Sequence, residues 1–357
     1  KIKNENLDAK QLELSNINSG LHFLAAPPGS GKTSVLTSRL KKALEVHPDN
    51  DIICLTFTTR AAKDMAKRAS SLLDERKPFI GNFHTLCLEQ NRNNENLPLK
   101  ERFSSILPDL YRNEFFSLTV KQVKTEQPSD FDIKLPQAYI SLASEYSEQY
   151  GDALIQKERT RFDRYVYFKI YSFLLLLEIS TDESLIEFAK KQLKPLLRMA
   201  IISCHKFYWG SNESVDYYKG ACCLWHIHQQ FRALKKKSNS IDYDDILCFG
   251  LLDLTNNPSH KEFIQVDEVQ DLNAIQWRII DTLLTKNSHI FVVGDAEQSI
   301  YSFLGADLQS LKNQTTHYHQ HSLIKNYRSN KGIVSLLNAY RKNTWGMQKI
   351  ESEISDH

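Results

Sequence analysis

The sequence predicts an α/β protein whose parallel sheet is interrupted by a large helical insertion, and three observations lead to this fold class. Apolar runs of strand length occur near the N-terminus, and amphipathic helical patterns follow the first two of them. The same rhythm returns between residues 263 and 294. Between these two parts the apolar residues follow helical spacing over long stretches, and glycine is scarce. Alternation of strands and helices is typical of a parallel sheet, because each helix carries the chain back to the edge where the next strand begins.

Each expected element has a local signal in the chain. The strands are short apolar runs, and the helices have apolar residues three and four positions apart, as in Val35, Leu36 and Leu40 after the first strand. The expected strands are residues 21–25, 51–57, 79–83, 263–267 and 289–294, and the clearest helices are 184–199 and 273–284. From about Ser322 a further strand and helix begin.

Composition and charge narrow the class of protein. The chain has 357 residues, enough for about two or three domains, and 41% of them are hydrophobic. With 45 basic and 43 acidic residues the net charge is only +2, so charge alone does not indicate a nucleic-acid partner. The most apolar run, 165–179, contains Lys169 and Glu178 and is too short to span a bilayer. No signal-peptide pattern opens the sequence and the six cysteines form no CxxC pair, so we expect a cytoplasmic protein with reduced thiols and no membrane partner.

The sharpest local feature is a glycine-rich turn between the first strand and its helix, Ala26-Pro27-Pro28-Gly29-Ser30-Gly31-Lys32-Thr33. In this context it predicts a phosphate-binding loop, because glycines let backbone N–H groups surround phosphate oxygens at a helix N-terminus. Lys32 would reach the β- and γ-phosphates of ATP, and the Thr33 hydroxyl would bind Mg²⁺. A glycine-rich turn without a ligand is the alternative. The predicted nucleotide-binding residues of the turn are Pro28, Gly29, Ser30, Gly31, Lys32, Thr33 and Ser34.

A second feature completes the expected site. The strand at 263–267 ends in adjacent carboxylates, Asp267 and Glu268. Ligands of open α/β sheets bind at the carboxyl ends of strands, so Asp267 would hold Mg²⁺ and Glu268 would act as the general base toward water. Taken alone, such an acidic pair would indicate an exposed turn. Because the chain also contains a phosphate loop, a role in the nucleotide site is favoured.

Besides the phosphate loop, seven segments in order resemble the motifs of superfamily 1 DNA helicases of the UvrD/Rep/PcrA type. These are Leu7–Gln11, Leu55–Ala62, Gly81–Leu86, Ile241–Leu247, Asp267-Glu268-Val269-Gln270-Asp271, Val293–Ala306 and Asn326–Ser329. The resemblance covers roughly residues 1–87 and 238–330. It implies a RecA-like ATPase core over 1–87 and 238–321, a helical insertion domain over 88–237, and the start of a second RecA-like domain over 322–357.

The same resemblance assigns roles to residues outside the phosphate loop. Gln11 and Tyr327 would hold the adenine, Gln298 would sense the γ-phosphate, and Arg328 would be an arginine finger. The expected single-strand track consists of Phe57, His84, Tyr301 and Phe303, whose rings would stack on bases without reading their identity. Burial in the core is the alternative for Phe57 and Phe303. Because the later motifs of the second domain do not occur before His357, the strand that carries Arg328 is expected to be unheld or added to the first domain's sheet.

The implied function is an ATP-dependent DNA helicase or translocase that uses ATP and Mg²⁺ and moves 3′ to 5′ on single-stranded DNA and at single-to-double-strand junctions. One alternative is the motor subunit of a helicase–nuclease complex in repair or phage defence, with a nuclease or repair protein as its partner. Another is a nucleotide-gated DNA-binding sensor that does not unwind, which is favoured by Leu304 at a position where relatives carry arginine.

Three weaker signals lie in the insertion. Basic and aromatic residues alternate from Lys157 to Lys169, which indicates either a nucleic-acid contact or an amphipathic helix with a solvated basic face. Lys235-Lys236-Lys237 is expected in a solvated loop, with contact to nucleic-acid phosphates as the alternative. The Cys and His residues around 222–228 permit a zinc site, but their spacing favours core packing.

Overall fold

A computed structural model describes residues 7–73, 76–89, 97–127, 134–150, 162–210, 214–295, 308–344 and 350–354. The chain forms two compact units. The α/β unit consists of Lys1–Leu86 and Asn257–His357, and the helical unit consists of Cys87–Asn256. The helical unit ends at Asn256, whereas the sequence predicted its end near residue 238. The difference arises because the helix Tyr243–Asn256 packs within the helical unit.

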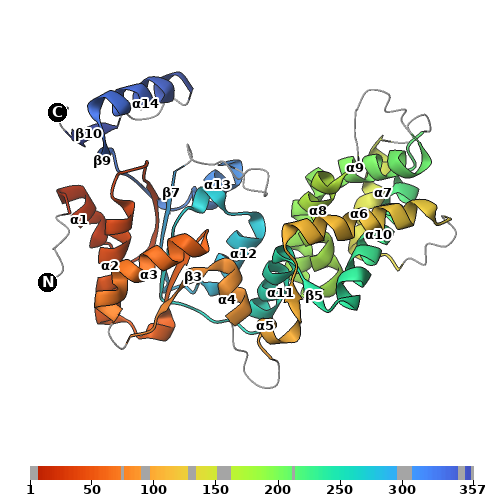
Figure 1. The fold of residues 1–357 in the computed structure, drawn as a ribbon, viewed down its shortest axis with the longest axis horizontal. Coiled ribbons are helices and arrows are strands. Elements are labelled where there is room, and N and C mark those ends of the chain that lie inside the picture. Colours follow the sequence, from red (N-terminus) through yellow and green to blue (C-terminus); the bar gives the residue numbers. More distant parts are fainter. Residues whose placement is uncertain are drawn as a thin grey trace. The chain divides into compact units, whose positions relative to one another are not determined.

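The α/β unit contains every strand expected before residue 300 (Figure 1). Its elements up to the insertion are α1 (Ala9–Ser15), β1 (Leu21–Ala25), α2 (Lys32–Val46), η1 (Asp49–Asp51), β2 (Ile52–Thr56), α3 (Thr59–Leu73), β3 (Phe79–Asn82) and α4 (Phe83–Glu89), which runs into the helical unit. After the insertion come β6 (Phe263–Val266), η3 (Val269–Asp271), α12 (Ala274–Leu283), β7 (His289–Gly294), α13 (Leu308–Thr315), β8 (His319–Ser322), β9 (Lys325–Asn330), α14 (Lys331–Thr344) and β10 (Glu351–Ile354).

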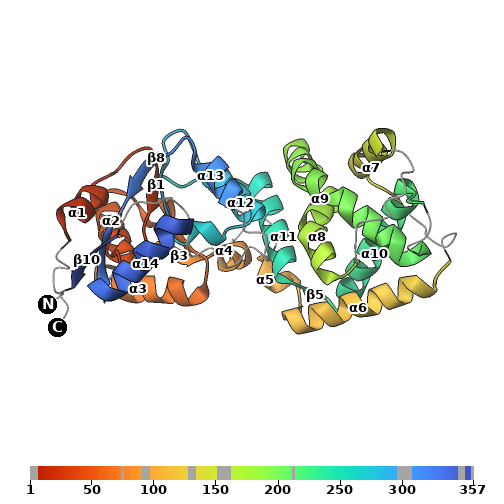
Figure 2. The same ribbon diagram turned by 90° about the horizontal axis from the view of Figure 1, so that it is seen from above.

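Six strands form one parallel sheet in the order β3-β2-β6-β7-β1-β8. Its two faces are both covered by helices (Figure 2). Leu24, Cys54 and Phe291 belong to the core beneath α2 and α3. Their neighbours along the strands, such as Ile53 and Val292, point to the opposite face because side chains alternate, and they too have no exposed surface. Burial on both faces is the reason why the inner strands β2, β6 and β7 are mostly apolar.

The segment after β8 forms a small layer of its own. Strands β9 and β10 pair in parallel, apart from the six-stranded sheet, and α14 packs against both. The expectation that this strand would be unheld or added to the first sheet is therefore wrong.

The helical unit consists mostly of helices. Its elements are α5 (Leu99–Arg102), β4 (Ser105–Ile106), α6 (Asp109–Thr125), α7 (Gln137–Tyr150), α8 (Arg164–Ile179), α9 (Glu183–Trp209), α10 (Tyr217–Lys237), β5 (Ser240–Ile241) and α11 (Tyr243–Asn256). The helix expected at 184–199 continues to Trp209 and tolerates Pro195 in its interior. No described helix has the length and apolarity needed to cross a membrane.

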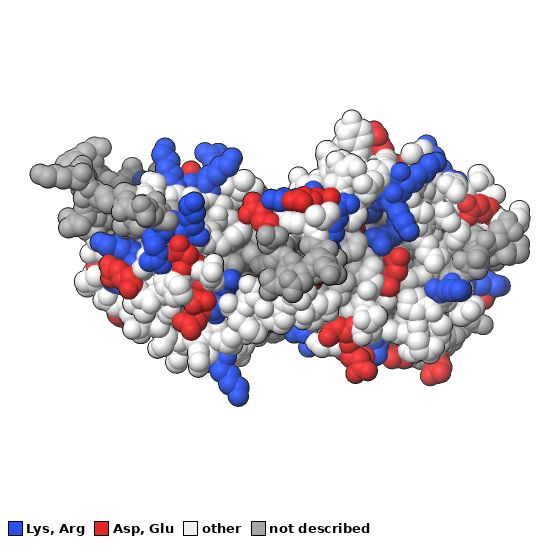
Figure 3. Space-filling view, turned by 90° about the horizontal axis from the view of Figure 1, so that it is seen from below, with Lys and Arg blue, Asp and Glu red and all other residues white. Residues whose placement is uncertain are grey.

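Two of the aromatic residues between Lys157 and Lys169 belong to the core of the helical unit. Phe162 is 6% exposed and Tyr167 is fully buried, where its ring stacks on Phe116 with centroids 4.8 Å apart. A nucleic-acid contact through these two rings is excluded, whereas Tyr165 is exposed. On the face drawn in Figure 3, Lys and Arg are interspersed with Asp and Glu over both units.

The Cys and His residues of α9 and α10 serve core packing. Cys204 and Cys223 are buried, and the His226 and His228 rings pair with Glu126 and Glu178 at 2.6 and 2.9 Å. Within the described ranges, no three His, Cys, Asp or Glu side chains are arranged to hold a metal ion.

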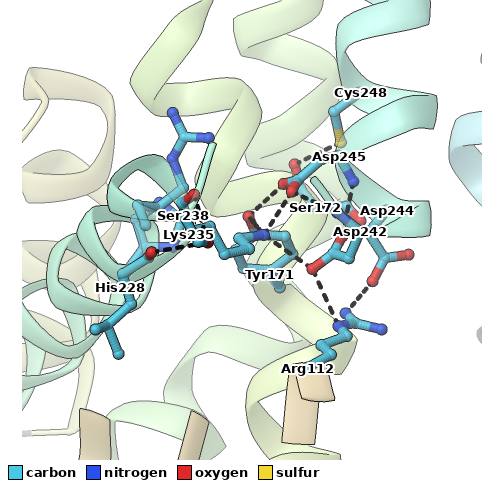
Figure 4. A network of polar contacts seen from close by, with 12 residues as sticks. Arg112, Tyr171, Ser172, His228, Lys235, Ser238, Asp242, Asp244, Asp245 and Cys248 are labelled. Carbon is cyan, nitrogen blue, oxygen red and sulfur yellow. Dashed lines mark hydrogen bonds and ion pairs between the residues drawn. The ribbon is translucent and has the colours of Figure 1, made fainter. Parts of the chain in front are cut away.

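Lys235 corrects the expectation of a solvated lysine run. It lies in the last turn of α10 and is 2% exposed, and its Nζ donates to Asp242 at 2.8 Å and Asp245 at 2.6 Å (Figure 4). Arg112 of α6 also contacts Asp242, at 3.2 Å, and pairs with Asp244. Although burial alone would raise the pKa of Asp242, the two cations hold it below its ordinary value. We call Arg112, Lys235, Asp242, Asp244 and Asp245 the buried charge cluster.

Four histidines gather where neighbouring strands of the α/β unit begin. His22 lies in β1, His289 in β7, and His319 and His321 in β8. The rings of His319 and His321 stack against His22 with centroids 5.0 and 5.1 Å away, and the His289 ring meets it edge-on at 5.7 Å.

The hydrogen bonds of His22 fit a neutral ring. Its Nε2 lies 2.7 Å from the Ser19 carbonyl oxygen, which can only accept, so Nε2 carries a proton. Its Nδ1 lies 2.9 Å from His321 Nε2 and acts as the acceptor there when the ring is neutral. Burial lowers the pKa of His22, in agreement with this arrangement.

The same logic applies to His289. Its Nδ1 donates to the Gly20 carbonyl oxygen at 2.9 Å, and its Nε2 faces the guanidinium of Arg39, which can only donate. Burial and the Arg39 charge lower the pKa of His289 to about 4. A second proton on this ring would meet a cation, so His289 stays neutral in the folded unit.

We expect acid to destabilise the α/β unit through this residue. An unfolded histidine takes up its proton near pH ~6.5, whereas folded His289 does so only near 4. The unfolded state therefore binds more protons between these pH values. The contribution to stability is complete above pH ~6.5 and is lost on acidification by about 1.4 kcal/mol per pH unit.

Hydrogen exchange of β1 and β7 peptides across this pH range, corrected for intrinsic rates, measures the effect. His289→Gln keeps a donor and an acceptor but does not titrate, so its pH dependence should be weaker than that of the wild type. His260→Gln changes an exposed histidine and is the matched control. Equal pH dependence in the wild type and His289→Gln would contradict the assignment.

Candidate nucleotide-binding site

The phosphate loop has the backbone that its sequence predicts. It joins β1 to α2, and Gly29 and Gly31 have φ of +77° and +81°, a region that side-chain-bearing residues rarely adopt. Gly31 is the N-cap of α2, and it provides no side-chain cap for the first turn of the helix. The uncapped N–H groups and the positive end of the helix dipole suit an anion such as a phosphate.

Two local features of the loop concern Ser30 and Gly31. The Ser30 side chain is 1% exposed, and its hydroxyl has no hydrogen-bond partner among the described residues. Such an orphaned buried hydroxyl is costly unless a ligand supplies the partner. A Cβ on Gly31 would collide with the side-chain amide of Gln11, so only glycine fits at this position of the loop.

Lys32 joins the loop to the two carboxylates that follow β6. Its Nζ donates to Glu268 Oε1 and lies 3.6 Å from Asp267 Oδ1. Burial alone would lower the pKa of Lys32, but the charges of Asp267 and Glu268 outweigh it and raise the pKa. The lysine is therefore a firmly charged group at the centre of the site.

The carboxylates differ in burial. Asp267 is 6% exposed, and burial raises its pKa to about 6, with Lys32 opposing this shift and Glu268 adding to it. Asp271, at the end of η3, has its pKa raised to about 6 by burial and by the charge of Glu268. A cation bound nearby would favour the ionised form of both groups.

Glu268 has a strained backbone. Its φ is 58°, in the left-handed region, and Asn239 is the other non-glycine residue with positive φ among those described. A non-glycine residue in this conformation costs roughly 1–3 kcal/mol, and such residues concentrate at functional sites. The turn places the Glu268 carboxylate beside Lys32 directly after the buried strand.

Gln11 lies against the phosphate loop. It is 4% exposed and donates from Nε2 to the Ser30 carbonyl at 3.0 Å. Asp8 fixes it through a capping box at the start of α1, in which Gln11 N donates to Asp8 Oδ1 and Asp8 N donates to Gln11 Oε1. Asp8 also accepts a hydrogen bond from the Tyr327 hydroxyl, so Gln11 and Tyr327 are brought to the same side of the loop.

Strand β9 is held on the phosphate loop. The Tyr327 N–H donates to the Gly29 carbonyl at 2.8 Å, and Asn326 Nδ2 donates to the Pro28 carbonyl at 2.8 Å. A Cβ added to Gly29 would lie 2.7 Å from Cβ of Arg328, so Arg328 stands directly over the loop, with an exposed side chain.

The described members of the expected track lie at one edge of the sheet. Phe57 directly follows β2, and His84 is in the first turn of α4 after β3. Strands β2 and β3 are parallel neighbours, paired at Thr56 and Asn82, so both residues follow the carboxyl ends of adjacent strands. Both side chains are half-buried. Gln298, Tyr301 and Phe303 lie outside the described residues.

Sequence reasoning missed Asp8 and Asn326. The spacing of Asp8 and Gln11 is that of a capping box, a local signal that was available. Asn326 had no such signal, because its contact with Pro28 joins segments almost 300 residues apart. Thr33 and Ser34 occupy the first turn of α2, as expected.

A glycine-rich loop with its lysine, facing a carboxylate pair at the end of a parallel strand, defines a P-loop nucleotide-binding domain. The family model for the UvrD/REP helicase N-terminal domain matches residues 7–319, and the chain belongs to this family.

Several curated relatives are similar over almost the whole chain. A probable DNA helicase II homolog of Mycoplasma capricolum is 26% identical over 352 residues, which are 94% of this chain and 41% of the relative. The ATP-dependent DNA helicase PcrA of Staphylococcus epidermidis is 24% identical over 94% of this chain and 40% of its own length. The ATP-dependent DNA helicase SRS2 of Saccharomyces cerevisiae is 27% identical over 92% of this chain and 26% of its own length. The chain thus spans about two fifths or less of these relatives.

Proposed function

We propose that the chain is the part of an ATP-dependent DNA helicase that binds and hydrolyses ATP and couples hydrolysis to 3′-to-5′ movement on single-stranded DNA. The observation that carries this proposal is the contact of Lys32 with Glu268 and Asp267 beside a phosphate loop with an unsatisfied buried hydroxyl. Membership of the UvrD/REP family and the printed names of the relatives support DNA as the substrate. The cytoplasm remains the proposed location.

In this proposal the phosphates of ATP compete for the Lys32 ammonium group. When Nζ turns to the β- and γ-phosphates, Glu268 Oε1 loses its donor and can accept the proton of the attacking water. Arg328, which stands over Gly29, would supply positive charge to the transferred phosphate, and Gln11 and Tyr327 would hold the base. Gln298 is proposed as the sensor of the γ-phosphate.

Magnesium is the proposed metal, and Thr33 and Asp267 would hold it. Hydroxyl and carboxylate oxygens are the ligands that this hard cation prefers, and the metal would neutralise charge between the phosphates when bound. The raised pKa of Asp267 is consistent with a carboxyl group that needs a cation to remain ionised at low pH.

The test of the proposed function is ATP turnover by this chain with and without oligothymidine. Stimulation by the single strand supports a motor. Nucleotide binding without turnover would instead support a sensor, and turnover that single strands leave unchanged would remove the coupling to DNA.

We propose that Phe57 and His84 form part of the single-strand track, together with Tyr301 and Phe303. Phe57→Ala should then weaken binding of oligothymidine and oligoadenosine alike by about 1–3 kcal/mol, because stacking on an aromatic ring does not read base identity. Fluorescence anisotropy measures the affinity. Tyr111→Ala, which removes an exposed ring of the helical unit, is the control. If the affinity of a folded Phe57→Ala variant were unchanged, Phe57 would be a packing residue.

A further inference from the structure

The side chain of Gln270 lies between the carboxylate of Glu268 and the end of β7. Gln270 is the middle residue of η3 and is 2% exposed. Its Nε2 donates to Glu268 Oε2 at 2.8 Å, and its Oε1 accepts from the backbone N–H of Asp295 at 3.0 Å. It thus contacts the proposed base on one side and the first residue after β7 on the other.

The chemistry of the partners fixes which way this amide faces. The Asp295 N–H can only donate, so it requires the oxygen of Gln270, and the ionised Glu268 carboxylate can only accept, so it requires the NH₂ group. A rotation of the amide by 180° would place two acceptors together and two donors together. Each contact therefore enforces the other.

The two oxygens of Glu268 then have separate holders. Oε1 accepts from Lys32, which the nucleotide is proposed to draw away, whereas Oε2 accepts from Gln270, which belongs to the same turn as Glu268 and is uncharged. When Lys32 leaves, the Gln270 contact still restrains a side chain whose backbone is already held in the left-handed region.

The end of β7 fits closely against this turn. A Cβ on Gly294 would lie 2.9 Å from Gln270 Oε1 and 2.9 Å from Val269 Cγ2, so only glycine allows the approach. The Gly294 carbonyl in turn accepts from Ala26 N at 3.0 Å, immediately before the phosphate loop. The backbone at Gly294 and Asp295 thus contacts the phosphate-loop side of the site through Ala26 and the turn that carries Glu268 through Gln270.

We propose that Gln270 is a positioning residue that keeps the Glu268 carboxylate aimed for catalysis and makes its aim depend on the backbone at the end of β7. This inference rests on the proposed ATP hydrolysis and adds its regulation. A shift of Asp295 would break its hydrogen bond to the Gln270 oxygen. The Gln270 amide could then rotate, and its NH₂ group would no longer be held toward Glu268.

The informative variant is Gln270→Glu, which keeps an acceptor for Asp295 but cannot donate to Glu268 when ionised. Gln270→Leu removes both contacts at similar volume, together with the weaker contact of Gln270 Nε2 with Asp271 Oδ2 at 3.4 Å. In ATP turnover without DNA, we expect kcat to fall about 10- to 100-fold in both variants, which is less than the roughly 10²- to 10⁴-fold that a general base contributes because Glu268 itself is retained, while the Kd of a fluorescent ATP analogue changes less than about 3-fold. Gln276→Leu removes a buried glutamine from a capping box on α12 and is the matched control, with wild-type kcat.

Three outcomes would overturn the inference. Wild-type kcat in Gln270→Glu would show that the donor to Glu268 is dispensable. A weakened Kd at unchanged kcat would place Gln270 in nucleotide binding. Equal loss of kcat and of melting temperature in the Gln270 and Gln276 variants would mean a structural role.

A second measurement needs neither turnover nor DNA. Binding of ADP with aluminium fluoride, a mimic of the transferred phosphate, should weaken in Gln270→Glu more than binding of ADP alone, and equal effects on both would contradict the inference. A wild-type chain that binds the mimic but is not stimulated by single strands would refute the proposed function and leave the Gln270 comparison intact.

Discussion

Lys32→Ala is expected to abolish ATP turnover, and Glu268→Gln is expected to retain nucleotide binding but lose about 10²- to 10⁴-fold in kcat. Lys32 is the cation that faces both carboxylates of the site, and its removal leaves Asp267, whose pKa is already about 6, with no opposing charge from that side chain. Glu268→Gln keeps the shape of the side chain but removes the group that takes the proton of water.

Turnover by a coupled assay and binding of a fluorescent ATP analogue separate the two effects. Glu262→Gln changes an exposed carboxylate just before β6, which pairs with His47 at 3.0 Å, and is the matched control for Glu268→Gln. If Glu268→Gln hydrolysed ATP at the wild-type rate, Glu268 would not be the general base.

Lys235→Met is expected to destabilise the helical unit by about 3–5 kcal/mol. The substitution removes the ammonium group from the buried charge cluster, so the carboxylates of Asp242 and Asp245, which are 0% and 1% exposed, each lose a charged hydrogen-bond donor. Arg112 still contacts the same oxygen of Asp242, Oδ2, but at the longer distance of 3.2 Å. Breaking a buried ion pair is costly because the remaining charge stays out of water.

Lys236→Met is the matched control, since the next residue along α10 is exposed and its change should stay within about 0.5 kcal/mol. Urea denaturation followed by circular dichroism compares the two variants. A similar free energy of unfolding for both variants would mean that the ion pairs of Lys235 contribute little net stability to the helical unit.

The strands and the phosphate loop could be predicted because their signals are local. A mostly apolar run such as His289–Gly294 favours a buried strand, and glycines directly before a lysine at the start of a helix are typical of a phosphate loop. The position of Lys235 could not be predicted, because three consecutive lysines look equally polar in the sequence. Only the fold shows that the first of them meets two aspartates that follow β5.

The contact of β9 with the phosphate loop escaped prediction for a related reason. The motif that begins at Asn326 assigned nucleotide contact to Tyr327, but nothing near it in the sequence indicated two hydrogen bonds to the carbonyls of Pro28 and Gly29. Such bonds depend on the path of the chain through β8, which pairs with β1 at the sheet edge.

These two bonds also bear on the thermodynamics of nucleotide binding. A glycine-rich loop has many accessible conformations, and a ligand that must select one of them loses part of its affinity to conformational entropy. Because β9 already fixes two consecutive carbonyls of the loop, much of that ordering is complete before any phosphate arrives. Strand β9 thereby acts as a template for the binding shape of a loop that lies about 300 residues earlier in the chain.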